Sequence, residues 1–151
     1  MKMVLITLLI SLVLSACETR PIDLGECPQP RFTGKAPADI YALKNPLDGE
    51  RAVDAGRQLY QRRISDNRIA CASCHGRDGN GIGSLSHMFK PPPRNFTCAS
   101  TIIGVPDGQL YWIIKNGSPG TSMPSFEELS DDQIWQVVHY IRRLSNGQYD
   151  N

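Results

Sequence analysis

The chain has 151 residues with 16 basic and 15 acidic side chains, so its formal net charge is only +1. A nearly neutral chain lacks the broad basic surface with which proteins bind nucleic acid, and we expect no nucleic-acid partner. Once the export signal at its start is set aside, the length suffices for one domain with a modest hydrophobic core and hardly for two.

The N-terminus has the features of an export signal. Lys2 precedes an apolar run of about a dozen residues, whereas a membrane-spanning helix needs roughly 20. The run ends in Leu-Ser-Ala-Cys at positions 14–17, which resembles the lipobox of bacterial lipoproteins. That resemblance implies a signal peptide over residues 1–16, diacylation of Cys17 and a protein held at a membrane by lipid. An ordinary secretory peptide with an incidental cysteine is the alternative.

Residues 17–47 are predicted to form an extended, proline-rich tether, because no apolar period of a helix or strand is sustained there. Its prolines are Pro21, Pro28, Pro30, Pro37 and Pro46. We therefore place the folded domain at residues 48–151. The tether would let this domain swing, or it could wrap on the domain through Cys27.

Three segments of the domain carry the apolar spacing of amphipathic helices. Two are residues 50–62 and residues 107–116, the second ending at a typical Asn-Gly stop signal. The third runs to Leu144 and follows a capping box made by Ser130 and Gln133. No strand pattern is found. The fold is therefore predicted to be all-α, with three to five short helices and long loops rich in glycine and proline.

Residues 71–75 read Cys-Ala-Ser-Cys-His, the attachment signature of c-type haem. Cys71 and Cys74 can each form a thioether with a haem vinyl group, and His75 can ligate the iron. The glycine-rich stretch that follows, residues 76–83, is predicted to pass close to a flat ligand. A zinc or dithiol site that adds Cys98 is an alternative, which the export signal and the lack of a βαβ pattern disfavour.

A second iron ligand is predicted at Met123. Only Met88 and Met123 lie outside the export signal, and Met123 follows His75 by 48 residues, in a loop between two predicted helices. Such a separation lets the chain wrap a haem and return from the opposite face, whereas Met88 is only 13 residues away. His87 or an open coordination site is the alternative.

Residues 50–144 resemble a class I monohaem bacterial cytochrome c. The resemblance rests on the haem signature, the first and last helices, the glycine-rich stretch, the triple proline at 91–93 and the Met-Pro pair at 123–124. It implies one covalently bound haem c with His/Met ligation. It also implies that the first and last helices cross at a small residue facing an aromatic one, here Gly56 with Tyr140 or Trp135.

Some of the haem surroundings stay open at this stage. Relatives often carry a proline where Ser84 stands, which leaves undecided the backbone carbonyl that orients His75. Arg94 is a candidate partner of a haem propionate, with a solvent role as the alternative. The side chains expected to pack on the haem, or to belong to the ordinary core, are Ile82, Leu85, Phe89, Phe96, Leu110, Ile113, Ile114 and Phe126.

Cys27 and Cys98 remain once lipid and haem occupy the other three cysteines. An even number of cysteines in an oxidising compartment favours a disulfide between them. Closing a loop of about 70 residues would stabilise the fold by about 4 kcal/mol in the chain-entropy model. Two free thiols, or pairing between molecules, are the alternative.

A haem with both axial positions filled predicts a single-electron carrier and not an enzyme. The sequence contains no nucleophile with an obvious base and no carboxylate pair in a motif, and we expect no small-molecule substrate. The expected protein is a lipid-anchored, periplasm-facing carrier for redox partners of a respiratory chain, either a free shuttle or a complex subunit. A haem protein with an open sixth site, acting as a sensor or a peroxidase-like enzyme, is the alternative.

Overall fold

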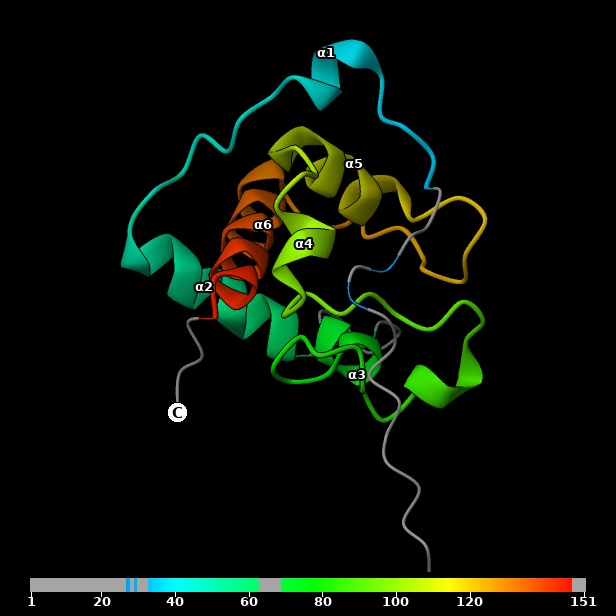
Figure 1. Cartoon of the computed structure of the whole chain (residues 1–151). Coiled ribbons are helices and arrows are strands. Elements are labelled where there is room, and N and C mark those ends of the chain that lie inside the picture. Colours follow the sequence, from blue (N-terminus) through cyan, green and yellow to red (C-terminus); the bar gives the residue numbers. More distant parts are fainter. Residues whose placement is uncertain (1–26, 28, 30–32, 63–68, 148–151) are drawn as a thin grey trace, which may run out of the picture.

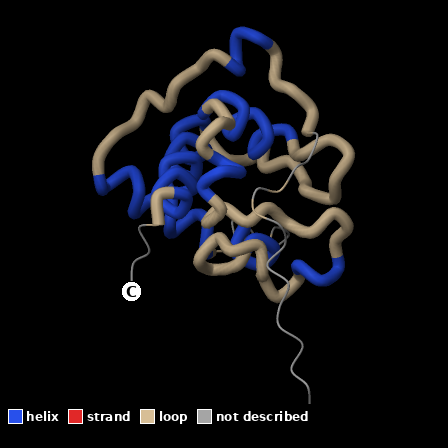
Figure 2. Tube along the Cα trace, in the orientation of Figure 1, coloured by secondary structure: helices blue, strands red, loops and turns tan. Residues whose placement is uncertain are grey.

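The computed structural model describes residues 27, 29, 33–62 and 69–147. Within these residues every regular element is helical, as Figures 1 and 2 show. The elements are α1 (Ala38–Tyr41), α2 (Glu50–Gln61), α3 (Cys71–His75), the 3-10 helix η1 (Ser86–Met88), α4 (Ala99–Ile102), α5 (Asp107–Asn116) and α6 (Asp131–Ser145). The all-α prediction is confirmed, and the three predicted helices are α2, α5 and α6. The other three α-helices are single turns of four or five residues, too short to show an apolar period.

Helices α2 and α6 cross and form the main helical pair of the domain (Figure 1). Gly56 lies at the crossing, because a Cβ atom built on it would lie 2.0 Å from the Gln136 carbonyl oxygen and 3.1 Å from the Tyr140 Cβ. Tyr140 is therefore the aromatic residue that faces Gly56. The other candidate, Trp135, instead stacks on Tyr111 with ring centroids 4.4 Å apart.

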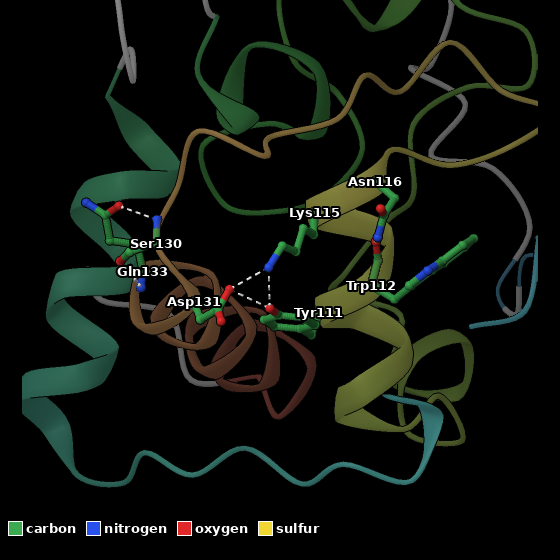
Figure 3. Close-up of polar contacts among 7 residues, drawn as sticks. All are labelled: Tyr111, Trp112, Lys115, Asn116, Ser130, Asp131 and Gln133. Carbon is green, nitrogen blue, oxygen red and sulfur yellow. Dashed lines mark hydrogen bonds and ion pairs between the residues drawn. The ribbon is translucent and has the colours of Figure 1, made fainter. Parts of the chain in front are cut away.

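The hydrophobic core lies between α2, α5 and α6. Its most deeply buried large side chains are Tyr60, Ile134, Val137, Val138 and Leu144. Four of them come from α6 at helical intervals, and each contributes about 1.5–3 kcal/mol by leaving water. The predicted capping box starts this helix, with the Gln133 amide donating to the Ser130 hydroxyl and the Ser130 amide donating to the Gln133 side chain (Figure 3).

A polar cluster joins the end of α5 to the start of α6 (Figure 3). Lys115 Nζ and the Tyr111 hydroxyl both donate to the Asp131 carboxylate at 2.6 Å. The hydrogen bond from Lys115, followed by that from Tyr111, lowers the pKa of Asp131. Since α5 ends just before residues 117–130 and α6 starts just after them, the cluster fixes both ends of this loop.

The N-terminal residues 33–47 pack on the domain, although they were predicted to be part of a tether with the domain starting at residue 48. Ala36 is buried, its amide donates to Gln109 Oε1 at 2.9 Å, and Gln109 Nε2 donates to the Gly34 carbonyl at 2.9 Å. Gly108 lets α1 approach, because a Cβ there would lie 1.8 Å from the Ile40 carbonyl oxygen. Hydrogen bonds to its backbone and two isolated apolar side chains, Ile40 and Leu47, hold this segment on the core, and neither leaves an apolar period in the sequence.

The predicted signal peptide at residues 1–16 and the lipid site at Cys17 lie outside the described residues, so both stay predictions. Among the residues that the structure describes, no helix is long and apolar enough to cross a membrane.

Candidate haem site

Helix α3 presents the haem signature on one turn. Cys71, Cys74 and His75 lie at relative positions i, i+3 and i+4, which share one side of a helix. All three line a cavity of about 280 Å³. Both cysteines are free thiols, and burial raises the pKa of Cys71 to about 12 and also raises that of Cys74. The cavity wall therefore offers two protonated thiols next to an imidazole.

The imidazole of His75 is held by its ring face and by one ring nitrogen. Its Nδ1 lies 3.0 Å from the Arg94 carbonyl oxygen, and the Phe96 ring stacks on it with centroids 4.5 Å apart. A carbonyl only accepts hydrogen bonds, so Nδ1 carries the proton and Nε2 carries the lone pair that binds a metal. The carbonyl that orients His75, left open by the sequence, is thus that of Arg94.

The glycine-rich stretch packs on the backbone of α3. The Gly81 amide donates to the His75 carbonyl at 2.7 Å, and the Gly83 amide donates to the Cys74 carbonyl at 3.1 Å. A Cβ on Gly83 would lie 2.2 Å from the Ser73 carbonyl oxygen, so no larger side chain fits there. These glycines do not line the cavity, and their role is to let the loop touch the haem-attachment helix rather than a flat ligand.

Met123 lines the same cavity as His75. The two residues come from separate parts of the molecule, α3 (green) and the loop between α5 and α6 (yellow to orange), which lie apart in Figure 1. The other two candidates for the second ligand are exposed on or near η1: Met88 is 65% exposed, and neither it nor His87 lines the cavity. Met123 is therefore the candidate that the fold brings to the haem side of His75.

The loop around Met123 is held by its own backbone. The Ser118 amide donates to the Met123 carbonyl at 3.2 Å, and the Met123 amide donates to Thr121 Oγ1 at 3.2 Å. Gly117 has a φ of +81°, and a Cβ on it would lie 2.9 Å from the Met123 carbonyl oxygen. A glycine is thus required at the start of the loop for both conformation and space.

The walls of the cavity are mostly apolar, as a haem requires. Six of the eight side chains expected around the haem line it, whereas Ile82 and Leu85 do not; the six are Phe89, Phe96, Leu110, Ile113, Ile114 and Phe126. Sequence reasoning missed further apolar lining residues, among them Ile102, Val105, Val137 and Ile141. Val137 and Ile141 lie on the apolar stripe of α6, where the sequence does not distinguish a side chain that packs in the core from one that contacts a cofactor.

Arg94 also lines the cavity, and its guanidinium Nη1 donates to the Gln29 carbonyl. Its contact with a haem propionate stays a prediction.

Cys27 and Cys98 form a disulfide across 71 residues, with their Cα atoms 5.7 Å apart. This pairing removes Cys98 from the alternative zinc site, and no group of three metal-binding side chains of the His, Cys, Asp or Glu type occurs among the described residues.

The residues present fit a covalently attached haem. Two thiols, an imidazole with a metal-binding Nε2 and a thioether line one apolar cavity. The two thiols suit the vinyl groups of haem c, and the imidazole and the thioether are the ligands that haem iron takes in cytochromes c.

Comparison with known proteins gives the same result. The family model described as Cytochrome c matches residues 53–145, more than half of the chain. The chain belongs to the cytochrome c family, and membership implies covalently bound haem c.

A solved structure is also similar to this chain. A chain of the Kuenenia stuttgartiensis reducing HAO-like protein complex Kustc0457/Kustc0458 is 33% identical in sequence, with a TM-score of 0.53. The match covers 66% of this chain and 46% of that chain. The protein therefore spans less than half the length of that relative.

Proposed function

We propose that the protein is a monohaem cytochrome c that carries single electrons, with His75 and Met123 as the two axial ligands of the iron. The observation that carries this proposal is that the His75 imidazole and the Met123 side chain line one cavity together with both thiols of the attachment signature. Bound haem supplies an iron that cycles between ferrous and ferric states. Held by His75 and Met123, the iron would offer no free site to a substrate.

The protein's own residues would keep the iron closed to other ligands. The hydrogen bond to Arg94 fixes the orientation of His75, and the hydrogen bonds of the Met123 backbone with Ser118 and Thr121 fix the loop that carries the second ligand. Apolar walls exclude water, and methionine as a ligand raises the reduction potential. These features suit a carrier better than a sensor or a peroxidase-like enzyme.

Spectroscopy of the purified holoprotein tests this assignment. We expect low-spin ferric iron and little carbon monoxide binding to the ferrous form. Met123→Ala should open the sixth site, so that carbon monoxide binds readily, whereas the matched control Met88→Ala should leave the spectrum unchanged because Met88 is exposed away from the cavity. High-spin ferric iron in the wild-type protein would overturn the carrier function and favour the open-site alternative.

The proposed partners are redox proteins of a respiratory chain. The similarity to a chain from a reducing HAO-like protein complex supports a redox partner, and it is compatible with a complex subunit as well as with a free shuttle. Purification of the full-length protein from its native membrane under mild detergent distinguishes the two, since a subunit co-purifies in fixed ratio with another redox protein and a shuttle does not.

We further propose that lipid on Cys17 holds the protein at a membrane on its periplasmic side. The support is the Leu-Ser-Ala-Cys sequence after a short apolar run. In cells supplied with a labelled fatty acid, the wild-type protein should incorporate the label and Cys17→Ser should not. A wild-type protein without label, or equal label in both proteins, would refute lipid anchoring at Cys17 and leave the haem assignment untouched.

A further inference from the structure

Gln29 contacts the peptide that orients His75 and also the side chain of Arg94, the residue that supplies the carbonyl of this peptide. It lies in the N-terminal segment, 46 residues before His75, and only 8% of it is exposed. Its side-chain oxygen accepts from the Asn95 amide at 2.9 Å, and its backbone carbonyl accepts from the Arg94 guanidinium. Gln29, which belongs to the segment predicted as a tether, therefore forms hydrogen bonds with the consecutive residues Arg94 and Asn95.

The two hydrogen bonds at this peptide form one chain. The Arg94 carbonyl, which accepts from His75 Nδ1, and the Asn95 amide, which donates to Gln29 Oε1, belong to the same planar peptide unit. A hydrogen bond donated by a peptide N–H polarises the unit and makes its carbonyl a stronger acceptor. Asn95 is 8% exposed, so little water competes for its amide.

We propose that Gln29 is a positioning residue for the haem ligand His75. By fixing and polarising the Arg94–Asn95 peptide, it strengthens the hydrogen bond from His75 Nδ1. A stronger acceptor at Nδ1 gives the imidazole more anionic character, which favours ferric over ferrous iron. Gln29 thereby lowers the reduction potential. This inference rests on the proposed function only in that His75 ligates the iron, and it does not depend on Met123.

The fold holds Gln29 in this place by independent contacts. The Gln29 amide donates to Thr101 Oγ1 at 2.9 Å, and the disulfide between Cys27 and Cys98 attaches the chain two residues earlier. Thr101 Oγ1 in turn lies 3.0 Å from Cys98 Sγ. The disulfide therefore fixes the position of a residue that acts on the haem ligand, as well as closing a loop.

Redox titration of the purified holoprotein tests the role of Gln29. Gln29→Leu removes the acceptor and keeps most of the side-chain volume, so the ratio of ferrous to ferric protein at a fixed applied potential should rise roughly three- to tenfold, where tenfold is about 59 mV for one electron. Gln29→Glu keeps an acceptor oxygen, and its potential should lie at or below the wild-type value.

Gln109→Leu is the matched control. Gln109 is another buried glutamine that ties the N-terminal segment to the domain, through Ala36 and Gly34, but it has no contact with the Arg94–Asn95 peptide. It should lower stability without raising the potential. An unchanged potential in Gln29→Leu, or an equal rise in Gln109→Leu, would overturn the proposal.

A second measurement separates this proposal from the carrier function. Solvent exchange of the His75 Nδ1 proton, followed by NMR in the ferrous holoprotein, should be faster in Gln29→Leu than in the wild type and unchanged in Gln109→Leu. This comparison needs only haem attached at His75. If the sixth site proves open, it still decides whether Gln29 acts on His75, and equal exchange rates in the two variants would refute that.

Discussion

The crossing of α2 and α6 depends on the missing side chain at Gly56, and Gly56→Ala tests it. The new Cβ would lie 2.0 Å from the Gln136 carbonyl oxygen, whereas real Cβ atoms essentially never come closer than 3.0 Å. The helices must therefore separate by about 1 Å, because the obstacle is backbone and cannot rotate away. A gap of this size forfeits a quarter to a half of the dispersion energy at each contact that it opens.

The magnitude follows from two opposing effects. Overpacking a well-packed core costs about 1–3 kcal/mol, and the rigid obstacle puts Gly56→Ala near the upper end. Alanine in a helix gains about 0.5–1 kcal/mol over glycine. We expect the free energy of unfolding of the holoprotein, measured by urea titration, to fall by about 2 kcal/mol.

Gly104→Ala is the control for this prediction. A Cβ on Gly104 would meet nothing within 4 Å, so the free energy of unfolding should change by no more than about 0.5 kcal/mol. A Gly56→Ala protein as stable as the wild type, or more stable, would show that the helices do not approach as closely as the structure indicates.

Three further predictions concern the disulfide, the α5–α6 cluster and the Met123 loop. The double variant Cys27→Ser/Cys98→Ser should lose about 4 kcal/mol of unfolding free energy in urea, since the disulfide spans 71 residues, and equal stabilities would refute the chain-entropy account. Asp131→Asn should lose about 0.3–1 kcal/mol at pH 7, because Lys115 lowers the pKa of the folded carboxylate and this exposed pair contributes little. The contribution is fully present above the unfolded-state pKa and disappears as the pH falls through the lowered pKa, so a difference from wild type that persists undiminished well below pH 4 would contradict it. Gly117→Ala should weaken the sixth ligand and increase carbon monoxide binding, because its Cβ would lie 2.9 Å from the Met123 carbonyl oxygen. Gly120→Ala carries the same positive-φ strain with nothing within 4 Å, and an equal effect there would assign the change to strain alone.

Local signals made part of this fold predictable. The Ser130–Gln133 capping box predicts where α6 starts, and a repeating apolar stripe predicts how long it is. Both signals depend only on residues that are close together in the sequence. The haem signature is equally local. The prediction of Met123 as the second ligand rests on two facts: only two methionines lie outside the export signal, and the other one, Met88, is close to His75 in the sequence.

The parts that escaped prediction depend on backbone groups far apart in the sequence. Every residue has a backbone carbonyl, so the sequence does not indicate that the carbonyl of Arg94 is the hydrogen-bond partner of His75. Gln29 is likewise ordinary in sequence, and its contacts with Arg94 and Asn95 exist only once the chain folds back across 65 and 66 residues. The helix α1 has four residues and no side-chain cap, so tertiary contacts alone define it.

The disulfide also changes what lipid on Cys17 would imply for electron transfer. A tether from residue 17 to residue 47 would let the domain swing widely. With Cys27 bonded to Cys98, the chain between Cys17 and the first point bonded to the domain is ten residues long. At 3.3–3.6 Å per residue, its greatest reach is roughly 36 Å. Under the proposed anchoring the domain therefore stays within about one domain diameter of the membrane, which favours redox partners at that membrane over distant soluble ones.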